Sequence, residues 1–246
     1  MFYDFHMHSC LSPCAEDEMT PNNICNMALI KGLDIIAVTD HNSTRQLRSI
    51  SEVAGEIGLK MLYGTELESS EEVHCLGIFA KLEDAESLQE WIDSKMPNIP
   101  NRPDYFGNQL LMDSQDEVTG IEDRLLIVSL TADLAECVDA IHSHGGKAIL
   151  AHVLDRANSV THQLGFIPMD LSYDGLEVKT LEQKQRVLKS HPWIKEDSTF
   201  WFIDSDAHRL IDMSEPENVI THDVIRKLWG DVLCCRIWPC TCWRYL

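Results

Sequence analysis

Short apolar runs alternate along the chain with longer segments in which apolar residues recur every three or four positions. The apolar runs have the length of β-strands and occupy residues 1–5, 33–38, 61–66, 73–80, 147–151, 174–178 and 200–203. The segments with helical spacing occupy residues 20–31, 44–57, 85–94, 132–144 and 181–190. Short strands alternating with amphipathic helices are typical of parallel βα units, so the pattern predicts an α/β fold.

The first predicted helix carries end signals of its own. Thr20 suits the N-cap and Pro21 suits the first helical position, where the missing N–H costs nothing. Gly32 suits the C-terminal end, since glycine readily adopts the left-handed conformation found there. These residues predict a helix between 20 and 32.

The organisation of the chain favours one large domain. Six or seven βα units without a glycine-rich phosphate loop favour a TIM-like barrel over a doubly wound sheet. We expect this barrel to span residues 1–228. Three prolines between positions 97 and 103 mark an irregular or helical insert, at about 97–130, near the rim of the barrel. Residues 229–246 form a Cys- and Trp-rich C-terminal tail.

Histidines and carboxylates gather at the strand ends. All of them except His74 fall at or just after the C-terminal end of a predicted strand, where a barrel carries its active site. These residues are His6, His8, His41, Glu66, His74, His152, Asp206 and His208. His74 lies in an otherwise apolar run, so a place in the core is its second interpretation. Solvated loops are a poor explanation for so many coincidences.

The residue types in these clusters indicate metal binding. His6 and His8 lie on one side of an extended segment because side chains alternate along a strand. Six histidines and two carboxylates exceed the four or so ligands that one zinc ion takes. We therefore expect two or three divalent cations, Zn²⁺, Mn²⁺ or Fe²⁺, with Mg²⁺ as a further option. Asp40 is expected to hold the ring of His41 from behind.

Charge and composition exclude some functions and leave the metal hypothesis standing. The 20 Lys and Arg residues against 40 Asp and Glu give a net charge of −20, which predicts no grip on nucleic acid and no binding to anionic membranes. No apolar run reaches the length of about 18 residues that a membrane span needs. The first residues do not resemble a signal peptide, so we expect a cytoplasmic protein.

The nine cysteines do not predict a disulfide framework. Those outside the tail are interpreted mainly as small buried apolar residues. Cys10 and Cys14, which are separated by three residues and lie beside the His6–His8 pair, leave a zinc-ligand role open as a second interpretation.

The motifs together resemble those of the PHP (polymerase and histidinol phosphatase) family. They run in order from Asp4-x-His6-x-His8-Ser9 through Thr39-Asp40-His41, Gly64-Thr65-Glu66, His74 and Ala151-His152 to Ser205-Asp206-Ala207-His208. The resemblance covers about residues 2–210 and implies a distorted (β/α)7 barrel, a trinuclear metal site and phosphoester hydrolysis. It assigns the eight histidines and carboxylates given above as metal ligands. A further family carboxylate falls in a segment that is two residues longer here, where Asp17 is the first choice and Glu16 the second.

The resemblance leads to a specific expectation for the chemistry. A metal-activated hydroxide would hydrolyse a small phosphate monoester, such as a nucleotide or histidinol phosphate. Asp206 or His208 would supply the leaving-group proton, and Arg156 and Arg209 would bind the phosphate. Two alternatives remain at this point: an amidohydrolase-type metal hydrolase, and a non-catalytic barrel that keeps its metals for stability or regulation. The oligomeric state has no signature in the sequence.

Overall fold

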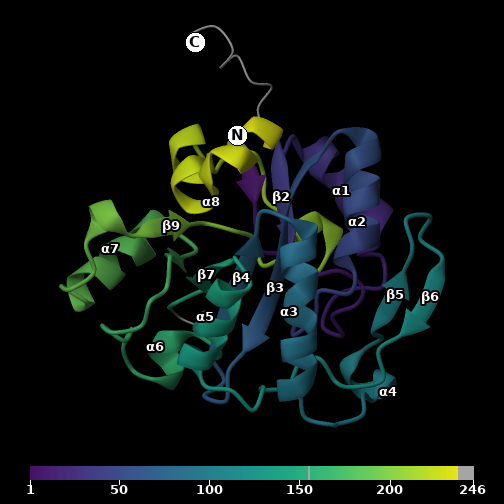
Figure 1. Ribbon diagram of the computed structural model, residues 1–246, viewed down its shortest axis with the longest axis horizontal. Helices are drawn as coiled ribbons and strands as arrows, with labels where there is room; N and C mark the ends of the chain where they lie inside the picture. The colour runs from purple at the N-terminus through teal and green to yellow at the C-terminus, as the bar shows by residue number, and fades with distance from the viewer. Residues whose placement is uncertain (155, 238–246) are drawn as a thin grey trace, which may run out of the picture.

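The computed structural model, which describes residues 1–154 and 156–237, is built around a curled seven-stranded sheet (Figure 1). The order in the sheet is β1-β2-β3-β4-β7-β8-β9. The strands are β1 (Tyr3–Asp4), β2 (Ile35–Val38), β3 (Lys60–Glu68), β4 (His74–Phe79), β7 (Lys147–Leu150), β8 (Gly175–Glu177) and β9 (Phe200–Phe202). This mixed α/β architecture is compatible with a distorted TIM-like barrel.

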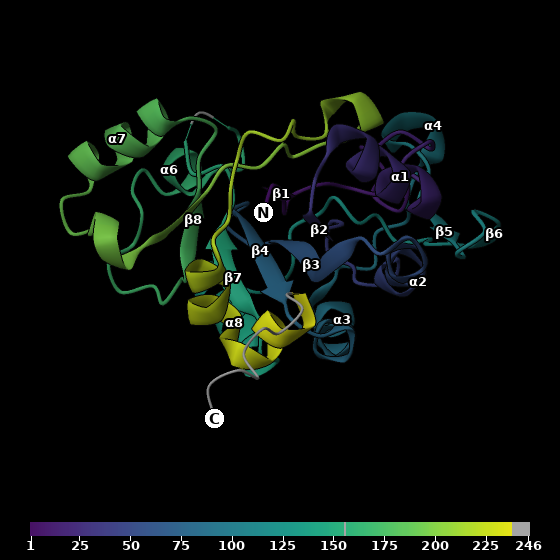
Figure 2. The same cartoon turned by 90° about the horizontal axis from the view of Figure 1, so that it is seen from above.

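Helices cover the outside of the sheet. Figure 2 shows α1, α2 and α3 in a row along one side. Of these, α2 packs on β3, and α3 packs on β3 and β4; α5 packs on β4 and β7. The longer helices are α1 (Pro21–Lys31), α2 (Leu47–Ile57), α3 (Leu82–Lys95), α5 (Leu134–Ser143), α7 (Leu181–Ser190) and α8 (His222–Ile237). Single turns form α4 (Pro103–Phe106) and α6 (Val160–Gln163), and 3₁₀ turns form η1 (Glu196–Ser198) and η2 (Leu210–Asp212).

The ends of α1 confirm the signals in the sequence. The Thr20 hydroxyl accepts a hydrogen bond from the backbone N–H of Asn23 at 3.3 Å, and Pro21 is the first helical residue. Gly32 ends the helix with a φ of 77°, a left-handed conformation that is strained for residues with a side chain. The N-cap bond and the left-handed glycine thus define this helix locally.

The direction of β4 departs from the expected all-parallel arrangement. β4 runs antiparallel to both β3 and β7, whereas the other neighbouring strands are parallel. Residues 69–73 join β3 to β4, and so short a connection can close a hairpin but cannot carry a crossover helix. As a result, the first residue of β4 lies at the rim where the parallel strands have their last residues.

The two outer strands of the sheet approach each other, which gives the sheet its curl. Met7 and Ala207 form a parallel β-bridge just beyond β1 and β9. The Asp206 N–H donates to the His6 carbonyl at 2.8 Å. These contacts bring the segments that follow the first and last strands side by side.

Alternate residues of the strands face two different cores. In β2, Ile36 and Val38 pack with the helices, whereas Ile35 and Ala37 point inside the curl with Phe5. At the end of the sheet beside the chain's first residues, α8 covers this inner core (Figure 1). Trp229 of α8 donates from its indole N–H to the Ile78 carbonyl at 3.2 Å, so the fold includes this first residue of the expected tail. Residues 238–246 of that tail lie outside the described residues.

The insert between α3 and α5 contains α4 and a hairpin of β5 (Leu110–Met112) and β6 (Val118–Ile121). It is fastened to the loop that follows His8: the Leu110 N–H donates to the Cys10 carbonyl at 2.9 Å. Gly107, at a φ of 107°, lies so close to this loop that a Cβ would stand 2.0 Å from the Pro13 carbonyl oxygen. Only glycine fits at this close approach.

Among the described residues, no helix combines the length and the apolar character that crossing a membrane requires.

Candidate metal centre

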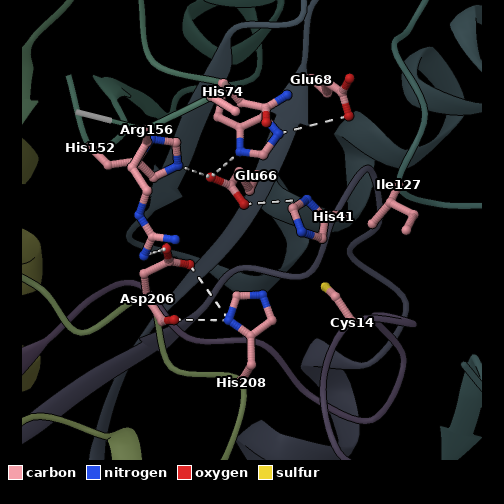
Figure 3. A pocket seen from close by; sticks show the side chains of 12 residues that line it. Cys14, His41, Glu66, Glu68, His74, Ile127, His152, Arg156, Asp206 and His208 are labelled. Carbon is pink, nitrogen blue, oxygen red and sulfur yellow. Dashed lines mark hydrogen bonds and ion pairs between the residues drawn. The ribbon is translucent and has the colours of Figure 1, made fainter. Parts of the chain in front are cut away.

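The strand-end histidines and carboxylates meet at one rim of the sheet. They line or underlie a cavity of about 380 Å³ (Figure 3). His6 and His8 follow β1, His41 follows β2 and His152 follows β7, whereas Asp206 and His208 follow β9. Glu66 lies within β3, and His74 reaches the same rim because β4 is antiparallel. The antiparallel strand therefore explains how a residue at a strand start joins residues at strand ends.

Glu66 is the centre of this cluster and is only 1% exposed. Both carboxylate oxygens face histidine nitrogens, and no basic side chain other than histidine comes within ion-pair distance of it among the described residues. Oε1 lies 3.3 Å from His6 Nε2, 2.9 Å from His74 Nδ1 and 3.3 Å from His152 Nε2. Oε2 lies 3.4 Å from His8 Nε2 and 3.3 Å from His41 Nδ1. A carboxylate so placed can bridge two cations.

Asp206 faces the cluster from the other side. Its Oδ1 lies 3.3 Å from His6 Nε2 and 3.4 Å from His8 Nε2. Its Oδ2 accepts a hydrogen bond from Arg156 Nη2 at 2.7 Å. The backbone of Asp206 is left-handed, with a φ of 56°, which is strained for a residue with a side chain. Strain of this kind persists where the surrounding structure holds a side chain in a functional position.

The donor atoms group into three sets, each tight enough to hold one ion. In each set the ligand atoms lie within 4.8 Å of one another. The sets are His8/His41/His208, His6/His8/Asp206 and His41/Glu66/His74. Imidazole nitrogen and carboxylate oxygen suit first-row divalent cations.

Unpaired polar atoms provide an independent sign of metal binding. Buried side-chain nitrogens and oxygens nearly always have a hydrogen-bond partner. Here five neighbouring atoms form no hydrogen bond of proper geometry, despite the short distances between some of them: His6 Nε2, His8 Nε2, His41 Nδ1, His74 Nδ1 and Glu66 Oε1. Coordination of cations would satisfy these atoms together, so the residues fit divalent metal ions.

The electrostatics of the cluster suit cations. Burial raises the pKa of Glu66, but His74 and His6 outweigh burial and hold the pKa well below its usual value. The pKa of Asp206 is also lowered, since His6 and His8 overcome the effect of burial. Burial and the neighbouring His8 lower the pKa of His208 to about 4. The lowered pKa values favour the unprotonated forms of Asp206 and His208, in which these side chains can bind metal ions. Their expected role as proton donors stays a prediction.

Two carboxylates in the site were missed by the sequence reasoning. Glu177 accepts hydrogen bonds at 2.9 Å from His6 Nδ1 and from the His152 backbone N–H. Glu68 lines the cavity 3.7 Å from His74 Nε2. Glu177 is the last residue but one of a predicted strand, close to where the other site residues lie on theirs, so this position was the available signal.

Asp40 supports the site through two serines instead of holding the His41 ring. It accepts hydrogen bonds from the Ser9 hydroxyl at 2.6 Å and the Ser12 hydroxyl at 2.7 Å. The Ser12 hydroxyl oxygen accepts in turn from the backbone N–H of His41 at 3.2 Å and lies 3.3 Å from His8 Nδ1. Asp40 thus fixes the loop that carries His8.

Asp17 and Arg209 are not brought into the cluster. Asp17 is exposed and accepts a hydrogen bond from Asn108 Nδ2 at 2.7 Å. The loop turns before it, so that Cys14 lines the cavity instead. Arg209 pairs with Asp212 through Nε at 2.7 Å. Arg156, by contrast, lines the cavity as expected.

The fold and the cluster together define an α/β protein with a candidate site for divalent metal ions. The model of the PHP domain matches residues 4–162, and the chain belongs to this family. It is accordingly a hydrolase of phosphoester bonds that uses divalent metal ions. This finding confirms the family and the reaction type expected from the motifs.

Several known proteins resemble the chain. A protein of Haemophilus influenzae named "5'-3' exoribonuclease" is 25% identical over 84% of this chain and 89% of its own length. A crystal structure from Bifidobacterium adolescentis, provisionally described as a metal-dependent phosphoesterase, has a TM-score of 0.59 at 20% identity, over 92% of this chain and 94% of its own. Endonuclease Q of Pyrococcus furiosus has a TM-score of 0.62 at 19% identity; the match spans 94% of this chain but 56% of the endonuclease.

These relatives correct the expectation about nucleic acid. Endonuclease Q has also been solved with a 27-mer duplex that carries an abasic lesion at the active site. Exclusion of nucleic-acid partners on the basis of a net charge of −20 is therefore wrong. Net charge averages over the whole surface and does not report the local potential at a rim that collects cations.

Proposed function

We propose that the protein hydrolyses phosphoester bonds at the 5′ end of RNA chains. The observation that carries the proposal is the convergence of Glu66, Asp206 and six histidines on one cavity. The substrate class is supported by the exoribonuclease-named relative, which aligns with 84% of the chain. Both are needed, because the ligand set supports the reaction type and says nothing about what the phosphate is attached to.

The three donor sets would hold two or three divalent cations. When bound, such ions neutralise the phosphoryl oxygens, activate a water molecule and stabilise the leaving oxygen. Glu66 would bridge two of them, since each of its oxygens faces a different group of histidines. Asp206 would complete the ligand shell and hold Arg156 at the same time.

Arg156 is the side chain best placed to bind the phosphate. Its side chain is 51% exposed, and it lines the cavity while one Nη2–H is held by Asp206. The guanidinium carries five N–H donors, so several remain for a phosphate. Arginine binds phosphate in a two-pronged geometry that lysine cannot reproduce.

A small phosphate monoester is the second candidate substrate. The cavity volume of about 380 Å³ is within the range of pockets that hold one small molecule. A free nucleotide would occupy the cavity in the same way as the terminal nucleotide of an RNA chain. The two candidates differ in whether the phosphoester links to a further nucleotide.

The test is an assay of metal-reconstituted protein with two substrates. A 5′-phosphorylated RNA oligonucleotide should be shortened from its 5′ end with release of mononucleotides, as followed by mass spectrometry. A panel of nucleotides and other small monoesters reports the release of inorganic phosphate. Glu66→Gln should abolish the activity, whereas Glu90→Gln, the same change on the exposed face of α3, should not. An intact oligonucleotide with rapid monoester hydrolysis would select the second candidate.

A further inference from the structure

The loop between His8 and α1 is held by hydrogen bonds on two sides of the candidate metal centre. The Ser12 N–H donates to the Ser9 carbonyl at 3.0 Å, and the Ala15 N–H donates to the Ser12 carbonyl at 2.9 Å. The next residue, Glu16, donates its N–H to the His208 carbonyl at 2.9 Å. The loop therefore passes from the serine beside His8 and His41 to the backbone of His208.

Cys14 lies in this bridging stretch. It is a free, exposed cysteine that lines the cavity. Figure 3 shows its sulfur pointing toward the rings of His41 and His208. The loop is held from outside by Gly107, whose backbone packs against the Pro13 carbonyl. The position of Cys14 is thus determined by contacts on both sides of the loop.

The histidines that Cys14 faces form a ligand set with no carboxylate. His8, His41 and His208 offer three nitrogens within 4.8 Å of one another. His8 Nε2 and His41 Nδ1 are buried, form no hydrogen bond and lie 3.4 and 3.3 Å from Glu66 Oε2, so these histidines fit ligation of ions in this part of the centre. Asp17, the carboxylate expected for this region, points to Asn108 instead.

We propose that the Cys14 thiolate is a protein ligand of the ion held by His8, His41 and His208. Binding would form a sulfur–metal bond and release the thiol proton to solvent, without any change in oxidation state. Three nitrogens and one sulfur would be a donor set of the kind that zinc takes in proteins. Thiolate ligation would select Zn²⁺ or Co²⁺ at this position over Mg²⁺ and Mn²⁺, which prefer oxygen ligands. The proposal rests on the proposed metal centre but not on its substrate.

The test is cobalt binding to the full-length protein, followed by absorption spectroscopy. Thiolate ligands give Co²⁺ a charge-transfer band in the near ultraviolet, whereas nitrogen and oxygen ligands give only weak visible bands. We expect the wild-type protein to show this band and Cys14→Ser to lose it. Cys10→Ser is the matched control, because Cys10 is buried and contacts the Leu110 carbonyl, and it should keep the band.

A second variant separates ligation from folding. Cys14→Asp should retain the cobalt ion but lack the charge-transfer band, while Cys14→Ala should bind about one ion fewer per chain by elemental analysis. A thiolate band that persists in Cys14→Ser comes from other cysteines and overturns the proposal. Visible cobalt bands with no thiolate band in the wild type would also overturn it, yet leave the metal centre intact. Failure to bind cobalt at all would refute both this proposal and the proposed function.

Discussion

His6 Nδ1 lies 2.9 Å from Glu177 Oε2, and the same carboxylate oxygen accepts the backbone N–H of His152. One buried carboxylate therefore orients a histidine ring of the centre and anchors a second ligand-bearing segment. Since Nδ1 is engaged in this way, Nε2 of His6 is left to face Glu66 and Asp206. The contact fixes which nitrogen of His6 is available to an ion.

Glu177→Gln should weaken metal binding without removing any ligand. Partners behind a metal-bound histidine typically contribute about 10- to 100-fold to metal affinity, and we expect a loss of this size. Competition with a chromophoric chelator measures it. Glu90→Gln provides the control, and unchanged affinity in Glu177→Gln would show that His6 needs no carboxylate behind it.

Glu66→Gln should have a larger effect than any substitution behind the ligands. It removes the charge that faces five histidines and should lower kcat/KM by more than about 100-fold, since two-metal chemistry depends on the bridging ligand. Elemental analysis should show fewer ions per chain. Full metal content together with full activity would contradict the role of Glu66 as a bridge.

Arg156→Ala and Arg209→Ala form a matched pair. Arg156 lines the cavity, whereas Arg209 pairs with Asp212 outside it. We expect Arg156→Ala to lower kcat/KM by about 10-fold or more, which corresponds to about 1.4 kcal/mol of lost transition-state binding. Metal content should stay unchanged in both variants. Equal kinetics in the two would remove Arg156 from the substrate site.

Removal of metal should destabilise the fold as well as stop the reaction. Ions that bind only the folded chain add stability that depends on their concentration. Chelator should therefore lower the Tm, and Zn²⁺, Mn²⁺ or Mg²⁺ should restore it to different extents. A Tm that is insensitive to chelator and to added metal would argue against the centre.

The ion pairs of Asp93 in α3 with Arg124 of the insert and with Arg45 should contribute a pH-dependent stability. Burial opposes ionisation of Asp93, but hydrogen bonds from Arg124 and Arg45, both at 2.7 Å, outweigh burial and lower its pKa. Because the pKa of Asp93 is lower in the folded chain, its ionised form stabilises the fold at pH values above the unfolded pKa of 3.8. This stability is lost as the pH falls through the folded pKa.

Asp93→Asn should therefore destabilise the protein at pH 7 by about 1 kcal/mol or less, because the pairs are partly exposed. The difference from wild type should shrink in acid denaturation below the unfolded pKa. The exposed Asp170→Asn is the control. A deficit that is the same at all pH values would show that the charge of Asp93 is not the cause.

The fold was predictable where the signal is local. The hydroxyl of Thr20, the ring of Pro21 and the φ of Gly32 act within a few residues, so the sequence predicts α1 closely. The direction of β4 was not predictable from its apolar run, because parallel and antiparallel strands bury the same residue types. The short connection from Glu68 to His74 was the available sign of a hairpin.

The candidate site was likewise predictable only in part. The gathering of histidines and carboxylates from the strand ends was predictable because a barrel brings such ends together. The place of Asp17 was not, since the course of its loop depends on Ser12 with Asp40 and on Gly107 with Pro13. These contacts join residues far apart in the chain, and no spacing rule in one sequence reveals them.

The reversed direction of β4 also bears on how this rim can change during evolution. The turn at residues 69–73 sits beside His74, so lengthening it would reshape the mouth of the cavity. The connection at residues 80–81, from β4 to α3, lies at the other end of the strand and can vary without reaching the site. In the parallel strands, the loop that follows each strand lies at this rim and can vary in length. At β4, the segment at this rim is instead the hairpin turn that precedes the strand.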